Sequence, residues 1–279
     1  HRRGRRPGPP ARVVIGMDYS EYLRVYNGLQ RPEDVKKFLD QGYDARLLGT
    51  LYTQKVSRYV KKNYGRIARH SREMLRAWNK GKTFCEIADF YEFPPVLTAM
   101  LIFREDGTGK KAFWSYVRDP SQLNSPETAK ELTEAAEQDL VYSPQADEEQ
   151  KARGQWGEGL LWQWLDGQGI KYKTENDERG ENGYEGGKTP DCLLAAPLEF
   201  EGKKICWIES KASFGDDIEF RYNRDHQLIP YTELFGPGVV VYWTGHLDEL
   251  KSPDPGILIE DKKILGKKLR PWSEDRTAE

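Results

Sequence analysis

Hydrophobic side chains recur at intervals of three and four residues, or sums of these, between residues 31 and 78, and this spacing predicts helices. Gly65 lies inside the pattern and is expected to interrupt it. The apolar positions are Leu48, Leu51, Val60, Ile67, Met74 and Leu75. The first half of the chain is therefore expected to form a helical domain.

Two further helices are predicted on either side of a tight turn at residues 91–93. Thr83 suits the N-cap of the first helix, and Glu86 completes a capping box with it. Pro94, at a first helical position, predicts the start of the second helix, which runs through Leu101. This pair resembles a helix-turn-helix that enters a DNA groove, although any two packed helices with a tight turn give the same pattern.

A second pattern begins after residues 143–155, a charged stretch without an apolar stripe in which we place a domain boundary. Residues 155–168 predict a helix, and short apolar runs bounded by turn residues predict strands. The strands are expected at 169–174, from 191, up to 211, at 238–243 and at 256–260, with a charged loop at 216–224 and a helix around 227–231. This order predicts an α/β (α+β) fold, in which a helical N-terminal domain precedes a core with a central mixed β-sheet flanked by helices.

Three charged residues are expected to meet in this sheet. Successive side chains of a strand point to opposite faces, so Glu209 and Lys211 share a face, ~7 Å apart along the chain, while Ser210 points away. A hairpin turn around Glu201–Gly202 carries Asp191 to within a residue or two of the lysine. A purely structural salt bridge is the alternative, but charges that follow an apolar, buried run are costly to leave unpaired.

The trio has the chemistry of a nuclease, because carboxylates hold a hard cation such as Mg²⁺ or Mn²⁺ and a lysine positions water or stabilises charge on phosphorus. Pro190-Asp191 followed by Glu209-Ser210-Lys211 resembles the PD-(D/E)xK nuclease superfamily. Longer stretches resemble a narrower family, the TPD-motif proteins or codanin-interacting nucleases. These stretches are 189–191, 207–216, 235–238 and 242–243. The resemblance is close from about residue 189 to 250, and it implies a restriction-endonuclease-like, Holliday-junction-resolvase-like core with Mg²⁺-dependent cleavage of DNA.

The resemblance implies further site residues. In the superfamily an acidic residue on the first core helix joins the metal site, and Glu158 matches it; a first-turn carboxylate that favours the helix dipole is the alternative. Gln227 and Tyr231 match the Gln-x-x-x-Tyr of RecB-like nucleases, although packing alone explains the tyrosine equally well. Pro230 between them must lie near a first helical turn or kink the helix. The implied metal ligands are Asp191, Glu209, Glu158 and the backbone carbonyl of Ser210.

The net charge of −2 conceals a division, because residues 1–118 carry 24 Lys+Arg against 12 Asp+Glu and the remainder carries 19 against 33. A basic part suits a protein that holds a polyanion, although chance asymmetry between two domains gives the same counts. Cations spaced by three or four predict one stripe able to follow a phosphate backbone, or simply a solvated face. The stripe comprises Lys55, Arg58, Lys62, Arg66, Arg69, Arg72 and Arg76.

Composition adds expectations about the cellular setting. No apolar run approaches the ~20 residues of a membrane span, and residues 1–7 lack the apolar core of a signal peptide. We therefore expect an intracellular protein without membrane contact, cytoplasmic, or both nuclear and cytoplasmic in a eukaryote. The cysteines lie too far apart for a zinc or disulfide framework and are expected to be buried thiols. They are Cys85, Cys192 and Cys206.

Four segments are expected along the 279 residues. They are a basic and partly disordered segment 1–30, a helical nucleic-acid-binding domain 31–143, a nuclease domain 144–265 and a polar tail 266–279. The expected function is that of a metal-dependent, structure-selective nuclease acting on DNA, with endonuclease and exonuclease action both left open, branched or flap DNA as candidate substrates, and RNA also left open. The alternative is a catalytically weak DNA-binding or protein-interaction module on a nuclease fold. A protein partner and a homodimer are both left open.

Overall fold

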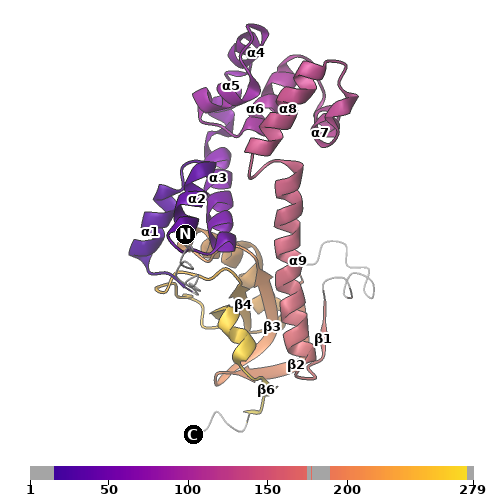
Figure 1. Ribbon diagram of the computed structural model, residues 1–279. Helices are drawn as coiled ribbons and strands as arrows, with labels where there is room; N and C mark the ends of the chain where they lie inside the picture. Colours follow the sequence, from indigo (N-terminus) through magenta and orange to yellow (C-terminus); the bar gives the residue numbers. More distant parts are fainter. Residues whose placement is uncertain (1–15, 175–176, 178–188, 275–279) are drawn as a thin grey trace, which may run out of the picture. The chain divides into compact units, whose positions relative to one another are not determined.

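The computed structural model describes residues 16–174, 177 and 189–274 (Figure 1). The chain divides into two compact units, unit 1 with His1–Leu51 and Arg153–Glu279, and unit 2 with Tyr52–Ala152. Both boundaries fall inside long helices, α3 (Ala45–Ala68) and α9 (Pro144–Asp166). The predicted domain limits at 31 and 144 are thus corrected, because the charged stretch 143–155 is the beginning of a continuous helix and not a linker.

Unit 2 is helical, as predicted. After α3 its elements are α4 (Ser71–Asn79), α5 (Phe84–Tyr91), α6 (Pro95–Glu105), α7 (Lys110–Arg118), the 3₁₀ turn η1 (Pro120–Gln122) and α8 (Pro126–Gln138). Their apolar faces form one core, which includes Met74, Phe84, Leu101, Phe113 and Leu132. The expected interruption at Gly65 is wrong, since α3 continues to Ala68. One glycine costs a helix only about 1 kcal/mol, which packing of the neighbouring Ile67 into the core offsets.

The predicted helix pair in unit 2 is present, but its second helix is buried. Thr83 caps α5 and Glu86 completes the capping box, as predicted. Pro94 is the N-cap of α6 and not its first helical residue. Because a proline side chain accepts no hydrogen bond, the buried Asp139 carboxylate accepts instead from the Val96 amide (3.1 Å). Seven of the eleven α6 residues are buried, so α6 is a core helix and its interpretation as a groove-entering helix is wrong.

Unit 1 contains a mixed β-sheet, which confirms the predicted fold class. The strands among the described residues are β1 (Tyr172–Lys173), β2 (Cys192–Phe200), β3 (Lys203–Lys211), β4 (Gly238–Tyr242), β5 (Ile257–Asp261) and β6 (Arg270–Pro271). They lie in the order β1-β2-β3-β4-β5, and β6 pairs with β2. β2 is antiparallel to its neighbours, whereas β3, β4 and β5 run parallel. The carboxyl ends of these three parallel strands therefore meet at one edge of the sheet.

Helices cover both faces of the sheet in unit 1 (Figure 1). On one face α9 contributes Leu161 to the same core as Ile208 of β3. The other face is covered by α11 (Asp217–Asn223), the π-helical turn η2 (Arg224–Leu228) and α12 (Ile229–Phe235). Tyr231 of α12 packs there against Trp207 of β3. Neighbouring residues of β3 thus enter different cores, which is the pattern of a strand buried on both faces.

Three segments of unit 1 that were expected to be irregular contain regular structure. Residues 19–28 form α1 (Tyr19–Gly28), which α2 (Pro32–Asp40) follows. The predicted charged loop at 216–224 is wrong, because Asp216 caps α11 by accepting from the Glu219 amide (2.8 Å). The predicted tail begins with residues that reach β6 at the edge of β2. Such short elements carry too little hydrophobic periodicity to be detected in sequence. Residues 1–15 and 275–279 of the two predicted end segments lie outside the described residues.

β2 and β3 form the predicted hairpin. Glu201 and Gly202 make its turn with φ values of 50° and 76°, as a two-residue turn of type I′ requires. Phe200 pairs with Lys203, as predicted, but the register then changes. The pairs Leu198↔Ile205 and Leu193↔Trp207 are five residues apart on β2 and only two apart on β3. β2 therefore contains a bulge of three extra residues, which the hydrophobic pattern of the sequence did not predict.

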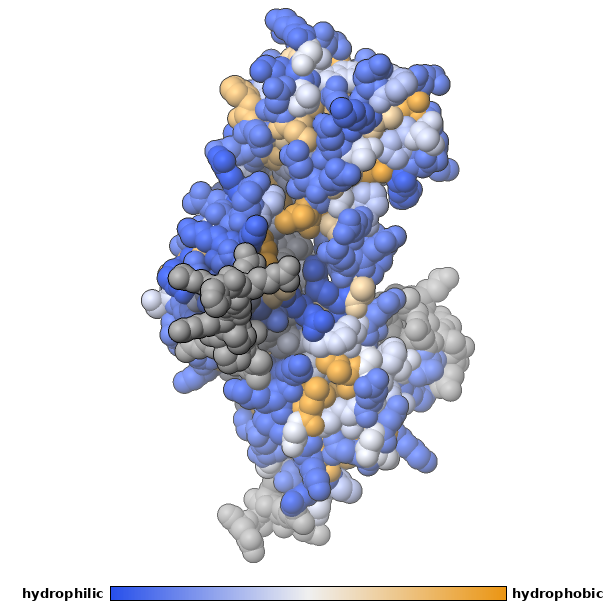
Figure 2. Space-filling view, viewed as in Figure 1, coloured by the Kyte–Doolittle hydropathy of each residue, from blue (hydrophilic) through white to orange (hydrophobic). Residues whose placement is uncertain are grey.

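The face of the molecule in Figure 2 is mostly hydrophilic in both units, with small hydrophobic areas. The exposed large apolar side chains include Phe90 of α5 (79% exposed) and Leu234 of α12 (64% exposed). Scattered residues of this kind are normal for globular proteins. Among the helices that the structure describes, none is both long and apolar enough to cross a lipid bilayer.

The close approach of α9 to the end of β3 generates a prediction about stability. A Cβ at Gly157 would lie 2.4 Å from Trp243 Cδ1, whereas a Cβ at Gly159 would meet nothing within 4 Å. Gly157→Ala is expected to lower the free energy of unfolding by about 1–3 kcal/mol, because the helix and the ring must separate. Gly159→Ala, the matched control, is expected to raise it by about 0.5–1 kcal/mol. Urea denaturation measures both, and effects of the same sign would contradict this packing.

Candidate active site

The predicted catalytic residues meet where β2 and β3 separate. Cys192 pairs with Ile208, so Asp191, one residue before β2, lies beside Glu209. Counting back from the hairpin turn without the bulge would place Asp191 beside Ala212, beyond the end of β3. The predicted approach of the aspartate to the Glu-x-Lys segment is confirmed, and the bulge decides which residue it meets.

Asp191 and Glu209 are held by hydrogen bonds to each other's main chain. Asp191 Oδ2 accepts from the Ser210 amide (2.8 Å), and the Asp191 amide donates to Glu209 Oε2 (3.1 Å). Each carboxylate is therefore positioned by the backbone of the neighbouring segment and not by its own rotamer preference alone. The amide and carbonyl of one strand residue point the same way, so the Ser210 carbonyl also lies on the Asp191 side, as its predicted role requires.

Lys211 shares a face with Glu209, as predicted from the strand period. Its Nζ donates to Glu209 Oε1 (2.7 Å) and to Gln227 Oε1 (2.6 Å). An ammonium group has three N–H donors, so these two partners leave one donor for water or a substrate oxygen. Ser210 points to the opposite face, where its Oγ accepts from Trp243 Nε1 (2.7 Å). This hydrogen bond was not predicted, because its two residues lie 33 positions apart in the sequence.

Gln227 reaches Lys211 from the π-helical turn η2. Single π turns are frequent at functional sites, because the wider turn changes the direction of a side chain. Pro230 lies in the first turn of α12, as predicted for a residue without an amide hydrogen. Tyr231 is 3% exposed and packs edge-on against Trp207, with 5.5 Å between ring centroids. Of the predicted Gln-x-x-x-Tyr pair, the glutamine bonds to the lysine and the tyrosine packs in the core.

Glu209 is a buried carboxylate, with only 3% of its surface exposed. Burial raises its pKa from 4.5 to about 7; the adjacent Lys211 ammonium opposes this shift and the Asp191 carboxylate adds to it. Two carboxylates and one lysine leave an excess of negative charge where little water reaches, and a divalent cation would neutralise it. The donors are carboxylate and carbonyl oxygens, which Mg²⁺ and Mn²⁺ prefer, and Mg²⁺ is often held by only one or two carboxylates together with water and phosphate. The residues therefore fit such an ion.

Glu158 stands apart from this pair of carboxylates. Within residues 16–174, 177 and 189–274, no three Asp, Glu, His or Cys side chains come close enough to hold an ion together, so the predicted group of three is absent. α9, which carries Glu158, covers the sheet face opposite to that of Glu209. Burial chiefly raises the pKa of the Cys192 thiol, and the charges of Asp191, Glu209 and Glu158 all add to it. Glu158 is thus a neighbour at the margin of the site.

The predicted cationic stripe is divided between two helices of unit 2. Lys55, Arg58, Lys62 and Arg66 lie on α3, Arg69 lies between the helices, and Arg72 and Arg76 lie on α4. Because α3 ends at Ala68, the seven cations do not form one helical row, and the prediction of a single stripe is corrected. Arg72 Nε also pairs with Glu105 Oε1 (3.0 Å), which reduces the positive charge it presents to a ligand.

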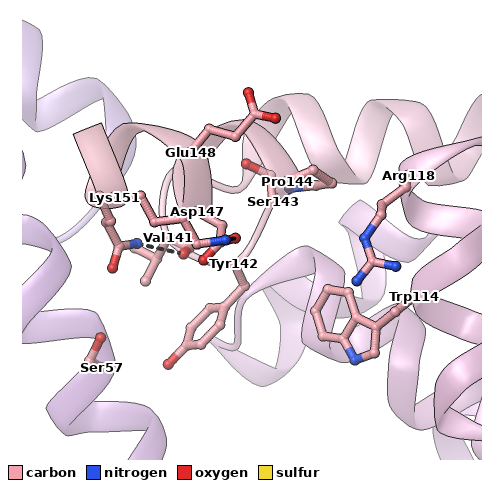
Figure 3. A pocket seen from close by; sticks show the side chains of 11 residues that line it. Ser57, Trp114, Arg118, Val141, Tyr142, Ser143, Pro144, Asp147, Glu148 and Lys151 are labelled. Atoms are coloured by element: carbon pink, nitrogen blue, oxygen red, sulfur yellow. Dashed lines mark hydrogen bonds and ion pairs between the residues drawn. The ribbon is translucent and has the colours of Figure 1, made fainter. Parts of the chain in front are cut away.

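Unit 2 also contains a pocket that no sequence motif indicated (Figure 3). Its volume is about 670 Å³, and its lining comes from α3, α7, the connection between α8 and α9, and α9 itself. Trp114, Arg118 and Tyr142 line it together with Asp147 and Lys151, which form an ion pair (2.6 Å). None of the predicted site residues is among its lining residues. Residues from four separate segments share no local pattern, which explains why sequence did not reveal it.

Comparison with known proteins places this site in a family. A model described as a protein of unknown function with a TPD sequence motif matches residues 124–263, a range that contains Asp191, Glu209, Lys211 and Gln227. The protein named CDAN1-interacting nuclease 1 from Xenopus laevis is 30% identical over 264 residues, 87% of this chain and 86% of the relative. The proteins of that name from Homo sapiens and Mus musculus are 29% and 30% identical over 270 residues, each covering 89% of this chain and 94% of the relative. No solved structure matches the chain. These matches confirm the narrower of the two resemblances, and the chain belongs to the TPD-motif family together with the relatives named CDAN1-interacting nuclease 1.

Proposed function

We propose that this chain is a divalent-metal-dependent nuclease of the PD-(D/E)xK type that hydrolyses phosphodiester bonds in DNA. The relatives' name describes a nuclease, and this supports the same reaction class here. The observation that carries the proposal is the arrangement at the fork of β2 and β3, where Asp191 and Glu209 are fixed by backbone amides and Lys211 is held by two partners. The words "CDAN1-interacting" in the relatives' name also support a protein partner for this chain.

Each residue of the cluster has a distinct part in this mechanism. Asp191, Glu209 and the Ser210 carbonyl would hold Mg²⁺ or Mn²⁺, which supplies charge neutralisation at the phosphate and a more acidic water. Lys211 directs its remaining N–H towards the attacking water or a phosphate oxygen, where its charge opposes the negative charge of the transition state. Gln227 limits the motion of the ammonium group. The burial of Glu209 keeps the local dielectric constant low, which strengthens all these interactions.

Glu158 takes a supporting part in the same proposal. Its charge acts on Cys192, which directly follows Asp191 in the chain. At this margin Glu158 would act as an outer carboxylate that helps to orient the residues holding the metal, as outer partners of metal sites do. Its substitution is therefore expected to weaken activity less than substitution of Asp191.

The proposed catalytic roles predict how strongly each substitution slows cleavage. Asp191→Asn, Glu209→Gln and Lys211→Ala are each expected to slow single-turnover cleavage by about 10²-fold or more, because each removes an interaction made with the transition state. Gln227→Ala is expected to slow it by about 10-fold, since it only orients the lysine. The assay compares duplex, flap, fork, four-way-junction and single-stranded DNA with RNA, in Mg²⁺, Mn²⁺ or chelator.

Two substitutions serve as controls in the same assay. Lys204→Ala removes a charge from the far end of β3, and Tyr231→Phe removes a hydroxyl from a packed ring; both are expected to retain most activity. Parental rates in the three site variants would exclude this cluster as the active site. Cleavage that persists in chelator would remove the metal from the proposal, and cleavage of RNA alone would replace the substrate.

The burial of Glu209 generates a pH dependence of stability in the metal-free protein. Its folded pKa of about 7 lies above the ordinary value of 4.5, so the folded state binds the proton more tightly. This contribution to stability is complete below about pH 4.5 and is lost as the pH rises through about 7. Glu209→Gln cannot ionise, so its unfolding temperature relative to the parent is expected to be higher at about pH 8 than at about pH 5. Calorimetry in chelator measures this, and a difference that does not change with pH would exclude burial as the cause.

A further inference from the structure

Two cationic side chains lie over the indole ring of Trp156 in α9. The Arg46 guanidinium lies 3.9 Å from the ring centroid, and Lys262 Nζ lies 5.9 Å from it. Arg46 comes from the first turn of α3 and Lys262 from the first residue of η3 (Lys262–Gly266), so three distant segments of unit 1 converge here. Both cations are exposed, and neither has a carboxylate partner among the described residues.

Two cations at one ring are an unbalanced arrangement. Each is attracted by the ring, but at an exposed position this attraction is weak, and the two positive charges repel each other. An anion beside the ring would be attracted by both at once. A guanidinium presents a planar fork of donors and an ammonium acts as a compact point charge, and both bind phosphate oxygens well.

This pair of cations lies beside the end of the catalytic strand. Trp156 packs edge-on against Trp243, with 6.3 Å between centroids and planes at 69°. Trp243 Nε1 donates to Ser210 Oγ (2.7 Å), and Ser210 stands between Glu209 and Lys211. The Trp156 ring therefore contacts Trp243, and Trp243 in turn is hydrogen-bonded to β3 between Glu209 and Lys211.

The sheet register gives the backbone distance from Lys211 to Asp261, the residue before Lys262. Lys211 pairs with Tyr242 of β4, and Tyr242 pairs with Asp261 of β5, the residue before Lys262. Two strand spacings amount to about 10 Å. That length corresponds to about three nucleotide steps of 3.4 Å along one DNA strand. Lys211 and the two cations lie on opposite faces of the sheet, so a nucleic acid that passes over the carboxyl edge of the sheet at Lys211 has its backbone within reach of both cations.

We propose that Arg46, Trp156 and Lys262 form a binding site for the phosphate backbone of the substrate, about three nucleotides from the bond that is cut. The ligand class is a phosphodiester polyanion, with the two cations on phosphate oxygens and the indole ring holding them at a fixed spacing. The position relative to the cut rests on the proposed function, whereas the binding itself does not. This site lies in unit 1 and is separate from the cations of α3 and α4 in unit 2.

The first test is the salt dependence of binding. Binding of the full chain to a fluorescein-labelled DNA duplex is followed by fluorescence anisotropy in chelator at a series of salt concentrations. Removal of each phosphate-binding cation is expected to make the slope of log K against log salt shallower by about 0.9, hence by about 1.8 for Arg46→Gln with Lys262→Gln. The exchange Arg46→Lys with Lys262→Arg keeps both charges and is expected to keep the parental slope.

The matched control removes two exposed cations from the other end of the sheet, Lys203→Gln with Lys268→Gln. Lys203 opens β3 at the hairpin, about 26 Å along the strand from Lys211. Lys268 follows Lys267, which pairs with Glu201 of the hairpin turn (2.8 Å). The slope of this control variant is expected to equal that of the parent protein.

A second test uses the parent protein and neutral methylphosphonate linkages placed singly along one DNA strand, so it does not depend on whether any variant folds. A neutral linkage at one or two adjacent positions, about three nucleotides from the cut, is expected to weaken binding of the DNA to the parent protein. The same linkage is expected to leave binding to the double variant Arg46→Gln with Lys262→Gln unchanged. An unchanged salt slope in that variant, or no sensitive linkage in the parent, overturns the site. If the double variant has a shallower salt slope but the parent protein cuts no nucleic acid, the proposed function is refuted and the phosphate-binding site is retained. If the parent cleaves nucleic acid but the double variant has an unchanged slope, the site is refuted and the proposed function is retained.

Discussion

The bulge in β2 is the constraint on which the candidate active site depends. It brings Asp191 beside Glu209, so that the aspartate carboxylate accepts from the Ser210 amide and its own amide donates to the glutamate. In the unshifted register neither bond could form, because Asp191 would lie beyond the last residue of β3. A bulge bends its strand and increases the local twist, so it also opens the fork in which a ligand can approach the carboxylates.

Electrostatics at this fork favour binding over stability. A buried glutamate beside another carboxylate is costly, and burial accordingly raises the pKa of Glu209. Lys211 relieves only part of it, and the π-helical turn that presents Gln227 holds the lysine in place. Removing the charge altogether would stabilise the fold and remove the reason for a cation to bind. Irregular backbone on both sides of the site, a bulge and a π turn, is consistent with residues placed for chemistry and not for packing.

Sequence revealed what depends on local pattern and missed what depends on tertiary geometry. The strand period indicated the common face of Glu209 and Lys211, and turn chemistry indicated the hairpin at Glu201 and Gly202, because both follow from a few adjacent residues. The bulge, the burial of α6 and the course of α9 across residue 152 arise from packing between distant segments, and no short window contains them. The cationic stripe was misread for the same reason, since the equal spacing continues in sequence beyond the point where the helix ends.

Three consecutive residues of α9 connect the cations at Trp156 with the carboxylates Asp191 and Glu209. The cations lie over Trp156, a Cβ at Gly157 would meet Trp243 and Ser210, and the charge of Glu158 acts on Cys192, the residue after Asp191. The glycine is what allows this, because any side chain there would separate the helix from the strand. A shift of α9 would move the phosphate-binding cations and the marginal acid together with respect to β3. The proposed phosphate-binding site and the surroundings of the proposed metal ligands are therefore coupled through one turn of helix. A change at Gly157 should alter both while leaving Lys211 and Gln227, which lie on the other face, in place.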